Sequence, residues 1–209
     1  MNFFEVFDLP RKLGIDAAEL QRRFHALSRR HHPDFHQSAP AEEQTRVLES
    51  SARVNAAYRV LRDPIARVEY LIRLEEGRVT PTEGDETADG HGGPSGSNVT
   101  PKAPPELLEE MFEIEETLHD ARTGGLDDTT RATVAAQRER LAARRAAEDV
   151  RITGELSVAW DAAAAGDKAK VLADFKVALA TRAYLRTVID DLGEALGGAD
   201  HLTAKGRQV

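Results

Sequence analysis

The sequence predicts an all-α protein built from two helical regions that a polar stretch separates. Three observations support this prediction. Apolar residues recur at intervals of three and four along both regions, which is the spacing of one face of an α-helix. Alanine and arginine are plentiful while aromatic residues make up only 5% of the chain, and this favours helices over a β-sandwich or barrel. The stretch between the regions is dense in glycine, proline, serine, threonine and aspartate, which is typical of a flexible linker.

These patterns predict four segments along the chain. We expect residues 1–76 to form a four-helix domain with a long helical hairpin, and residues 77–103 to form the linker. We expect residues 104–198 to form an antiparallel three-helix bundle and residues 199–209 to form a frayed tail.

Composition restricts the classes of function. The chain carries 36 acidic and 28 basic residues, a formal net charge of -8, which argues against a general nucleic-acid-binding protein. It has no cysteine, which excludes disulfides, thiolate catalysis, zinc fingers and iron–sulfur clusters held by the protein itself. We expect no cofactor. No apolar run is long enough to span a membrane and the first residues do not resemble a targeting segment. We therefore expect a cytoplasmic protein of bacterial type, or a mitochondrial matrix protein if the chain has been processed.

Capping residues indicate where the first two helices begin. Asn2 can cap a short helix over residues 3–9, which the following proline should end. A second helix begins at Asp16, with Glu19 three residues later in the arrangement of a capping box. Its apolar stripe consists of Leu20, Phe24 and Leu27.

Two further helices complete the N-terminal region. The third is expected over residues 40–62, where Asp63-Pro64 breaks it, and the fourth is expected to stop at Gly77. The residues predicted to face inward are Val47, Leu48, Ala52, Tyr58 and Leu61 in the third helix, and Ile65, Val68, Leu71 and Ile72 in the fourth.

The tripeptide His32-Pro33-Asp34 lies between the second and third predicted helices. Pro33 lacks an amide hydrogen and keeps the preceding residue out of the α region, so the second helix should end near His31. The three side chains would then be exposed at the tip of a helical hairpin, a geometry that suits presentation to a partner.

The face of the second helix that leads to this loop is basic. A run of basic residues usually forms a solvated face, but in an acidic protein a basic face also suits binding to an acidic partner. The residues of this basic face are Arg22, Arg23, Arg29 and Arg30.

Three helices are predicted in the C-terminal region. The first runs from Pro104 to about Arg122, and the second covers residues 128–165 with a weak point at Thr153-Gly154. Gly166 breaks the second helix, Asp167 caps the third, and the third is expected to end at Leu196, before two glycines.

Apolar residues crowd more than one side of the first of these helices. A stripe of this kind is usually core, but a wide apolar arc also leaves surface for an exposed docking patch. The candidates for such a patch are Leu107, Leu108, Met111 and Phe112, joined from the last helix by Tyr184 and Leu185.

A four-helix domain with His-Pro-Asp between its second and third helices resembles the J domain of DnaJ-type co-chaperones. A narrower resemblance is to the HscB co-chaperones of iron–sulfur cluster assembly, and it comes from both regions of the chain. The residues that carry it are Val54-Asn55-Ala56-Ala57-Tyr58, Leu61, Pro64, Arg67, Tyr70-Leu71-Ile72, the opening Phe4, Phe7, Leu9-Pro10, Asp16 and Leu20, and Trp160-Asp161-Ala162-Ala163-Ala164. The residues after the tripeptide, Phe35-His36, depart from the family, which often has a basic residue followed by Phe.

The resemblance implies a function as well as a fold. It implies that the protein docks on a DnaK/HscA-class chaperone, stimulates its ATPase, and delivers an IscU-type iron–sulfur scaffold protein to it. It assigns the docking to His32, Pro33 and Asp34 together with the basic face. By position it assigns scaffold binding to Leu108, Phe112 and Tyr184, with Leu107, Met111 and Leu185 as additions. Such a protein would be a regulator of another protein's ATPase and not itself an enzyme.

Three other interpretations stay open at this stage. The chain could be a general J-protein for other clients, although it lacks the Gly/Phe-rich segment and cysteine repeats of such proteins. It could be a purely structural helical adaptor in which the loop is only a turn. It could also be a metal protein that uses the side chains around the loop. Pro33 interrupts the helical spacing that such a site needs. The candidate ligands are His25, His31, His32, Asp34 and His36.

Overall fold

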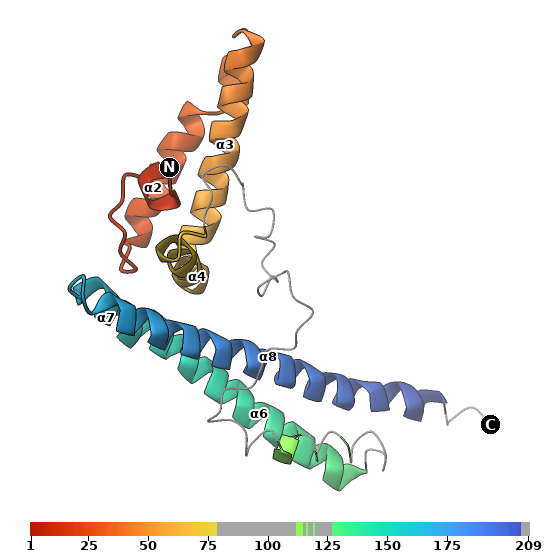
Figure 1. Ribbon diagram of the computed structural model, residues 1–209. Helices are drawn as coiled ribbons and strands as arrows, with labels where there is room; N and C mark the ends of the chain where they lie inside the picture. The colour runs from red at the N-terminus through yellow and green to blue at the C-terminus, as the bar shows by residue number, and fades with distance from the viewer. Residues whose placement is uncertain (79–111, 115, 117–118, 120–126, 206–209) are drawn as a thin grey trace. The chain divides into compact units, whose positions relative to one another are not determined.

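The computed structural model describes residues 1–78, 112–114, 116, 119 and 127–205, with side chains up to residue 197. Within these ranges every regular element is a helix, so the all-α prediction is confirmed (Figure 1). None of the helices described there is long and apolar enough to cross a bilayer. The predicted linker, apart from residues 77 and 78, lies outside the described residues, as does most of the helix predicted from Pro104.

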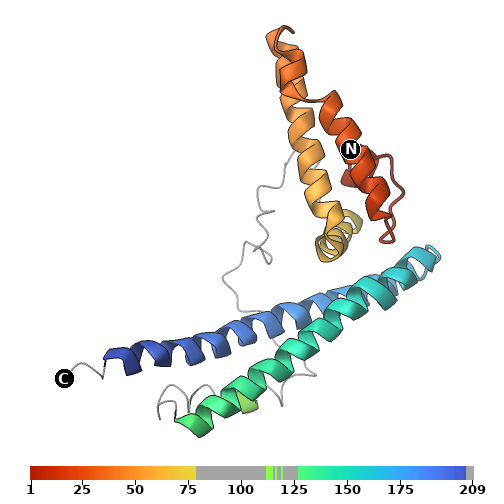
Figure 2. The same cartoon turned by 180° about the vertical axis from the view of Figure 1, so that it is seen from behind.

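The N-terminal region contains four α-helices and one turn of 3₁₀ helix. Helices α2 and α3 lie side by side and run in opposite directions, and the 3₁₀ turn η1 joins them at the tip of the hairpin (Figure 1, Figure 2). The elements are α1 (Phe3–Val6), α2 (Ala17–Arg30), η1 (Pro33–His36), α3 (Ala41–Arg62) and α4 (Pro64–Glu75).

Helix α1 is capped as predicted but is shorter than predicted. The Asn2 side chain accepts a hydrogen bond from the Glu5 amide at 3.0 Å, and the Glu5 carboxylate accepts one from the Asn2 amide at 3.0 Å. This reciprocal pair is a capping box. The helix ends at Val6, before the prolyl residue expected to stop it, because Asp8 adopts a left-handed backbone with φ of 52°.

Helix α2 has the predicted bounds but only half of the predicted cap. The Asp16 carboxylate accepts hydrogen bonds from the amides of Ala18 and Glu19, at 2.8 and 3.3 Å. The capping-box prediction for Glu19 is wrong, because its carboxylate accepts hydrogen bonds from Arg22 and Arg23 instead. These residues lie three and four positions further along the helix. The helix ends at Arg30, as the following proline dictates.

Aromatic stacking holds the N-terminal helices together. The rings of Phe24 and Tyr58 stack with centroids 4.0 Å apart, which joins α2 to α3. Phe3 stacks on Tyr70 at 4.5 Å and donates its backbone N–H to the Tyr70 hydroxyl at 2.8 Å, which joins α1 to α4. Beneath these contacts is a fully buried core that includes Phe4, Phe7, Leu20, Leu61 and Leu71.

The inner face of α3 differs from the prediction at two positions. Leu48 is 56% exposed and Ala52 is exposed, so their assignment to the core was wrong. Each residue of an α-helix is rotated by about 100° from the one before it, and the face that packs is fixed by the spacing of the other apolar residues. The buried residues of α3 are Val47, Val54, Ala56, Ala57, Val60 and Leu61.

Helix α4 begins and ends as predicted. The Asp63 carboxylate accepts a hydrogen bond from the Ala66 amide at 2.8 Å, and Pro64 occupies the first helical position. Gly77 follows the helix with φ of 67°, a left-handed conformation that suits glycine because it has no Cβ.

The C-terminal region contains an antiparallel helix pair. Helices α6 (Asp128–Arg151) and α8 (Lys168–Lys205) run side by side in both views, connected through a π-helical turn η3 (Ile152–Leu156) and α7 (Ser157–Ala162) (Figure 1, Figure 2). Their shared core contains Ile114, Val134, Leu141, Tyr184, Leu185, Val188, Ile189 and Leu192.

Three predicted boundaries of this region change. The weak point at Thr153-Gly154 is the π-helical turn, in which the helix widens instead of breaking. Helix α7 then ends at Ala162, before the predicted Ala165, because Ala163 has an extended backbone. Helix α8 continues through Gly197 and its neighbour to Lys205, past the predicted end at Leu196. Glycine lowers helix propensity by about 1 kcal/mol relative to alanine, which weakens a helix without ending it.

Contacts group the described residues into two compact units. One unit contains residues 1–78 together with 153–172, and the other contains the described residues from 112 to 152 together with α8 from residue 173. The N-terminal unit therefore includes α7, which the sequence analysis assigned to the C-terminal bundle. The Asp161 carboxylate accounts for this, since it accepts hydrogen bonds from the amides of Leu13 and Gly14, at 2.8 and 2.7 Å.

A buried arginine holds the same backbone from the other side. The guanidinium of Arg67 donates to the carbonyl oxygens of Leu61, at 2.7 Å, and of Leu13. Burial lowers the pKa of Arg67, and the carboxylates of Asp63 and Asp161 oppose that shift. The connection between α1 and α2 is thus held between a buried cation and the carboxylate of α7.

Candidate functional site

The tripeptide predicted to be exposed lies at the tip of the α2–α3 hairpin. His32 has an extended backbone and precedes η1, in which Pro33 occupies the first position. The side chains of His32 and Asp34 are 52% and 70% exposed. Three chemically distinct side chains are therefore displayed together by a turn that two helices hold.

The His32 imidazole shapes this turn from within. Its Nδ1 atom lies 3.3 Å from the Asp34 amide nitrogen and 3.5 Å from the Asp34 carboxylate. In the neutral tautomer protonated at Nε2, Nδ1 accepts the amide hydrogen bond; when Nδ1 is protonated, it pairs with the carboxylate instead. The ring can thus organise the loop in either protonation state while its Nε2 edge remains available to a partner.

Two residues brace the loop, a role that the sequence did not predict for either of them. The Nε2 atom of His36 lies 3.2 Å from the Arg30 carbonyl oxygen at the end of α2, and its Nδ1 lies 3.8 Å from the Glu43 carboxylate in α3. The Gln44 side-chain amide donates to the carbonyl oxygens of Gln37 and Ala39, at 3.0 and 2.9 Å. A glutamine in the first turn of a helix without a side-chain cap is a signal that could have indicated this role.

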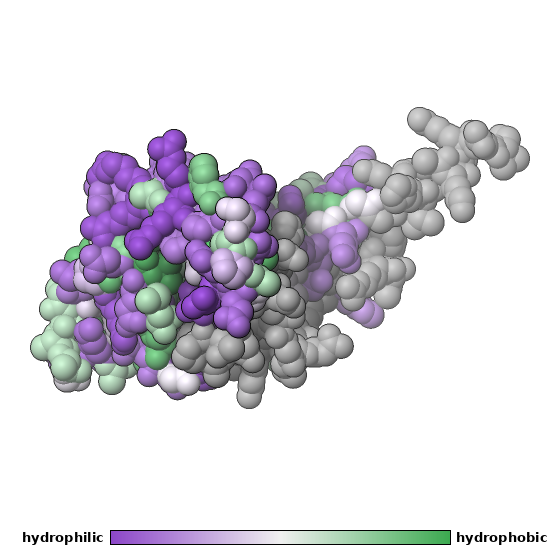
Figure 3. Space-filling view, turned by 90° about the horizontal axis from the view of Figure 1, so that it is seen from above, coloured by the Kyte–Doolittle hydropathy of each residue, from purple (hydrophilic) through white to green (hydrophobic). Residues whose placement is uncertain are grey.

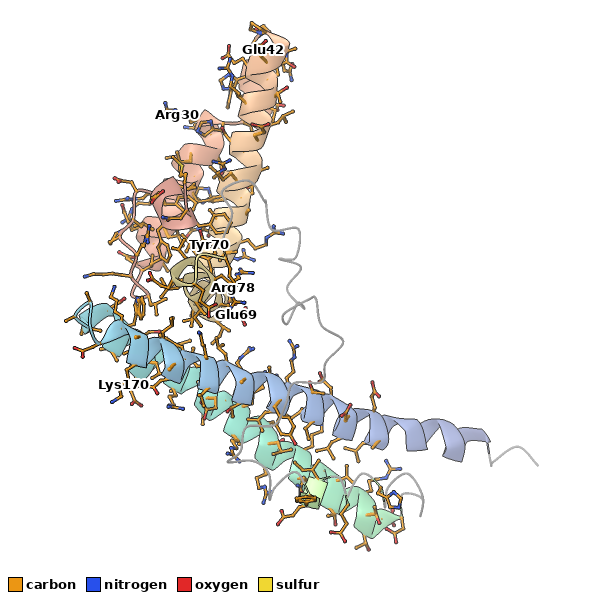
Figure 4. The ribbon with its side chains drawn as sticks, viewed as in Figure 1. Arg30, Glu42, Glu69, Tyr70, Arg78 and Lys170 are labelled. Atoms are coloured by element: carbon orange, nitrogen blue, oxygen red, sulfur yellow. The ribbon has the colours of Figure 1, made fainter. Side chains whose placement is uncertain are left out.

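The pKa of the neighbouring His31 is lowered. Burial lowers the pKa of its imidazole, and the nearby charge of Arg30 and the His36 ring lower it further. Arg29 and Arg30 place two positive charges at the end of α2, and both side chains are exposed. Arg30 is the last residue of α2, and Glu42 lies in the first turn of α3 (Figure 4).

The predicted basic face divides into two parts. Arg29 and Arg30 project into solvent beside the loop, whereas Arg22 forms an ion pair with Glu19 at 2.6 Å. Arg23 is used within the chain, since its guanidinium donates to the carbonyl oxygens of Phe7 and Asp8, each at 2.6 Å. Arg23 therefore joins α2 to the end of α1, and little of its charge is left for a partner.

The residues of the predicted apolar patch in the C-terminal region differ in exposure. Phe112 is 68% exposed. Leu107, Leu108 and Met111 lie outside the described residues. Tyr184 is 6% exposed and Leu185 is fully buried, so their assignment to an exposed patch was wrong. Helix α8 turns residues 184, 185, 188, 189 and 192 toward α6, and this spacing places both side chains in the core.

Histidine and carboxylate side chains do not gather into a metal site in the part of the chain that the structure describes. No group of three or more histidine, aspartate or glutamate side chains there is arranged to hold an ion. The candidate ligands around the loop, His25 to His36, all belong to this described part.

Comparison with known proteins gives matches over the N-terminal region and, for one relative, over most of the chain. The DnaJ domain family matches residues 2–70. The co-chaperone HscB homologue of Bordetella avium is 33% identical over 169 residues, which cover 81% of this chain and 88% of that protein. The co-chaperone HscB homologue of Vibrio cholerae is 39% identical over 75 residues, and these cover 36% of this chain and 44% of that protein. The match to the Vibrio protein thus spans less than half of its length.

Two solved structures share the fold. The structure of the chaperone HscB from Vibrio cholerae matches with a TM-score of 0.51 and 23% identity, over 92% of this chain and 99% of that one. The structure of the human co-chaperone protein HscB matches with a TM-score of 0.56 and 21% identity, over 92% of this chain and 81% of that one.

Proposed function

The chain belongs to the HscB family of co-chaperones, and from this premise we propose that it stimulates the ATPase of a DnaK/HscA-class chaperone and delivers an IscU-type iron–sulfur scaffold protein to it. The chain acts as a regulator of that ATPase and does no bond-breaking chemistry of its own. We propose a cytoplasm of bacterial type as its place of action, or a mitochondrial matrix for a processed chain.

The single observation that carries the proposal is the display of His32, Pro33 and Asp34 on a braced turn. The side chains of His32 and Asp34 are exposed, and η1 is tied to α2 through His36 and to α3 through Gln44. A partner that docks there meets an ordered surface, so little free energy is lost in ordering the loop on binding.

The charges around the loop fit an ATPase with acidic and basic groups at its docking site. The exposed Asp34 carboxylate can accept a charge-assisted, bidentate hydrogen bond from an arginine of the chaperone. The exposed guanidinium groups of Arg29 and Arg30 would raise the association rate with an acidic surface and make binding sensitive to salt. Arg22 contributes less because Glu19 neutralises it, and Arg23 serves the fold of the domain.

Stimulation requires a difference in affinity between two states of the chaperone. A ligand shifts an equilibrium only by as much as it binds one state better than the other. We propose that the loop binds best to the conformation in which the bound ATP is hydrolysed, and that His32 and Asp34 supply the contacts that distinguish the two states.

Scaffold delivery is assigned to the first helix of the C-terminal region. Phe112 is the described residue of the proposed patch that is exposed, and Leu107, Leu108 and Met111 share its helix in the sequence prediction. Tyr184 and Leu185 support this surface from the core and do not contact the scaffold directly.

The experiment is steady-state ATP hydrolysis by the cognate HscA-class chaperone, with this chain and an IscU-type scaffold added separately and together. We expect synergistic stimulation, lost in His32→Gln and uncoupled from the scaffold in the double variant Leu108→Ala/Phe112→Ala. Stimulation without any effect of the scaffold would contradict scaffold delivery and leave a J-protein for another client. Absence of any stimulation by folded protein would contradict the proposal as a whole.

A further inference from the structure

Phe35 is a large apolar side chain that the fold leaves in solvent. It follows Asp34 directly, lies within η1, and is 69% exposed. A single exposed apolar residue is ordinary on a protein surface, so exposure alone carries no function. What distinguishes Phe35 is how its ring is held and which groups surround it.

The ring of Phe35 is held in place by its own turn. Its backbone N–H donates to the His32 carbonyl oxygen at 3.1 Å, which closes the turn. Its ring contacts the His32 imidazole edge-on, with centroids 5.8 Å apart and planes at 63°. The fixed backbone of Pro33 and the bonds from Gln44 restrain the same loop. An aromatic ring presented in this way can enter a partner with little loss of conformational entropy.

Polar groups surround this ring. The imidazole of His32 and the carboxylate of Asp34 are exposed beside it, and Arg29 and Arg30 are exposed at the end of the adjoining helix. On the face seen from above in Figure 3, hydrophilic residues predominate among the coloured ones and hydrophobic residues form smaller areas between them. An apolar centre with a polar rim is the arrangement of the residues that contribute most to protein–protein binding.

We propose that Phe35 is an apolar anchor of the docking loop, which inserts into a recess on the HscA-class chaperone beside the group that binds Asp34. This inference rests on the proposed function and extends it by one residue and one kind of contact. The recess must be apolar to accept the ring, must carry a cationic group within reach of the Asp34 carboxylate, and must have acidic groups facing Arg29 and Arg30. The His32–Asp34 pair provides orientation, whereas Phe35 provides affinity and selects chaperones that have the recess.

The test separates affinity from stimulation. The full-length chain is titrated into the cognate HscA-class chaperone with ATP, and the half-maximal concentration and the maximal rate of hydrolysis are measured. Removing a phenyl ring that becomes fully buried weakens binding by about 10- to 100-fold. We therefore expect Phe35→Ala to raise the half-maximal concentration by that factor while the maximal rate at saturation stays near that of the unaltered chain. His32→Gln should instead lower the maximal rate.

Matched variants identify the contact. Leu48→Ala removes a comparably exposed apolar side chain of the same unit, at 56% exposure, and should leave both values unchanged. Phe35→Leu keeps most of the apolar area but loses the ring contact with His32, so its half-maximal concentration should fall between those of the unaltered chain and Phe35→Ala. Because Phe35 is exposed, circular dichroism should show each variant folded.

Three results would overturn the inference. A half-maximal concentration for Phe35→Ala within threefold of the unaltered chain would show that the ring contacts nothing on the chaperone. Equal losses in Phe35→Leu and Phe35→Ala would assign the effect to the lost contact with His32. Failure of the unaltered chain to stimulate hydrolysis would overturn the proposed function first and the inference with it, so the two failures are distinguishable.

Discussion

The contact between Asp161 and the α1–α2 connection predicts how strongly α7 stabilises the N-terminal unit. The perturbation is Asp161→Ala, which removes the acceptor of two backbone hydrogen bonds, to the amides of Leu13 and Gly14. It also removes one of the two carboxylates that oppose the effect of burial on Arg67. All of these contacts lie within one compact unit.

The two bonds differ in how well water can replace them. Leu13 is 4% exposed, so its amide would be left buried without a partner, and a hydrogen bond to a charged group contributes about 1.5–3 kcal/mol. Gly14 is exposed, and water can take the place of the carboxylate there, so its bond contributes roughly 0.5–1 kcal/mol. We expect Asp161→Ala to lower the free energy of unfolding by about 2–4 kcal/mol.

The assay combines urea unfolding with amide hydrogen exchange. Urea unfolding monitored by circular dichroism gives the change in stability, and exchange under native conditions gives the protection of individual amides. The amides of Leu13 and Gly14 should exchange at least about tenfold faster in the variant. The Leu20 amide, which donates to the Asp16 carbonyl oxygen at 2.9 Å, serves as an internal reference.

Two further variants are compared with Asp161→Ala, one as a control and one as a milder change at the same contact. Glu155→Ala removes the same charge from an exposed position of η3 and should leave stability within about 0.5 kcal/mol of the unaltered chain. Gly14→Ala would place a Cβ 3.1 Å from Oδ2 of Asp161, so it should disturb the same contact more mildly. Unchanged unfolding and unchanged exchange at Leu13 in Asp161→Ala would contradict a stabilising role of the Asp161 carboxylate.

Three other changes have defined outcomes. Leu185→Ala removes most of a fully buried side chain from the core between α6 and α8. It should lower the free energy of unfolding, measured with urea, by about 2–5 kcal/mol. An unaltered urea midpoint would contradict the place of Leu185 in that core. Gly77→Ala forces a side chain into a left-handed backbone and should lower thermal stability by about 1 kcal/mol; a rise in the midpoint would contradict the αL cap of α4. The hydrogen bond from Arg23, and after it the one from Arg22, lowers the pKa of Glu19 in the folded state. These bonds therefore stabilise the folded state at pH values above 4.5, the ordinary pKa of the group. Their contribution is lost as the pH falls through the lower pKa of the folded state. Unfolding followed from pH 7 to pH 3 should therefore show a smaller loss in Glu19→Gln than in the unaltered chain, and parallel curves would contradict this.

Local chemistry made most ends of the N-terminal helices predictable from the sequence, the end of α1 excepted. Asn2, Asp16, Asp63 and Gly77 each act on groups within a few residues, so a linear pattern contains the needed information. The His-Pro-Asp turn was predictable for the same reason, because Pro33 restricts its immediate neighbours.

Tertiary contacts account for what the sequence left unpredicted. Leu48 and Ala52 fit an apolar stripe as well as Val54 and Val60 do, and only packing against α1, α2 and α4 decides between them. Tyr184 and Leu185 look alike as docking or core residues until the register of α8 against α6 is known. Asp161 lies almost 150 residues from its partners, and no pattern within α7 indicates that its carboxylate reaches Leu13.

We expect the exposed, braced His-Pro-Asp turn to change the ATPase rate of a chaperone. Single-turnover hydrolysis of ATP bound to the cognate HscA-class chaperone measures this most directly, because product release does not contribute. We expect a saturating amount of the full-length chain to raise the single-turnover rate, and we expect His32→Gln, although folded, not to raise it. An equal rate with the unaltered chain, with His32→Gln and with neither would contradict it.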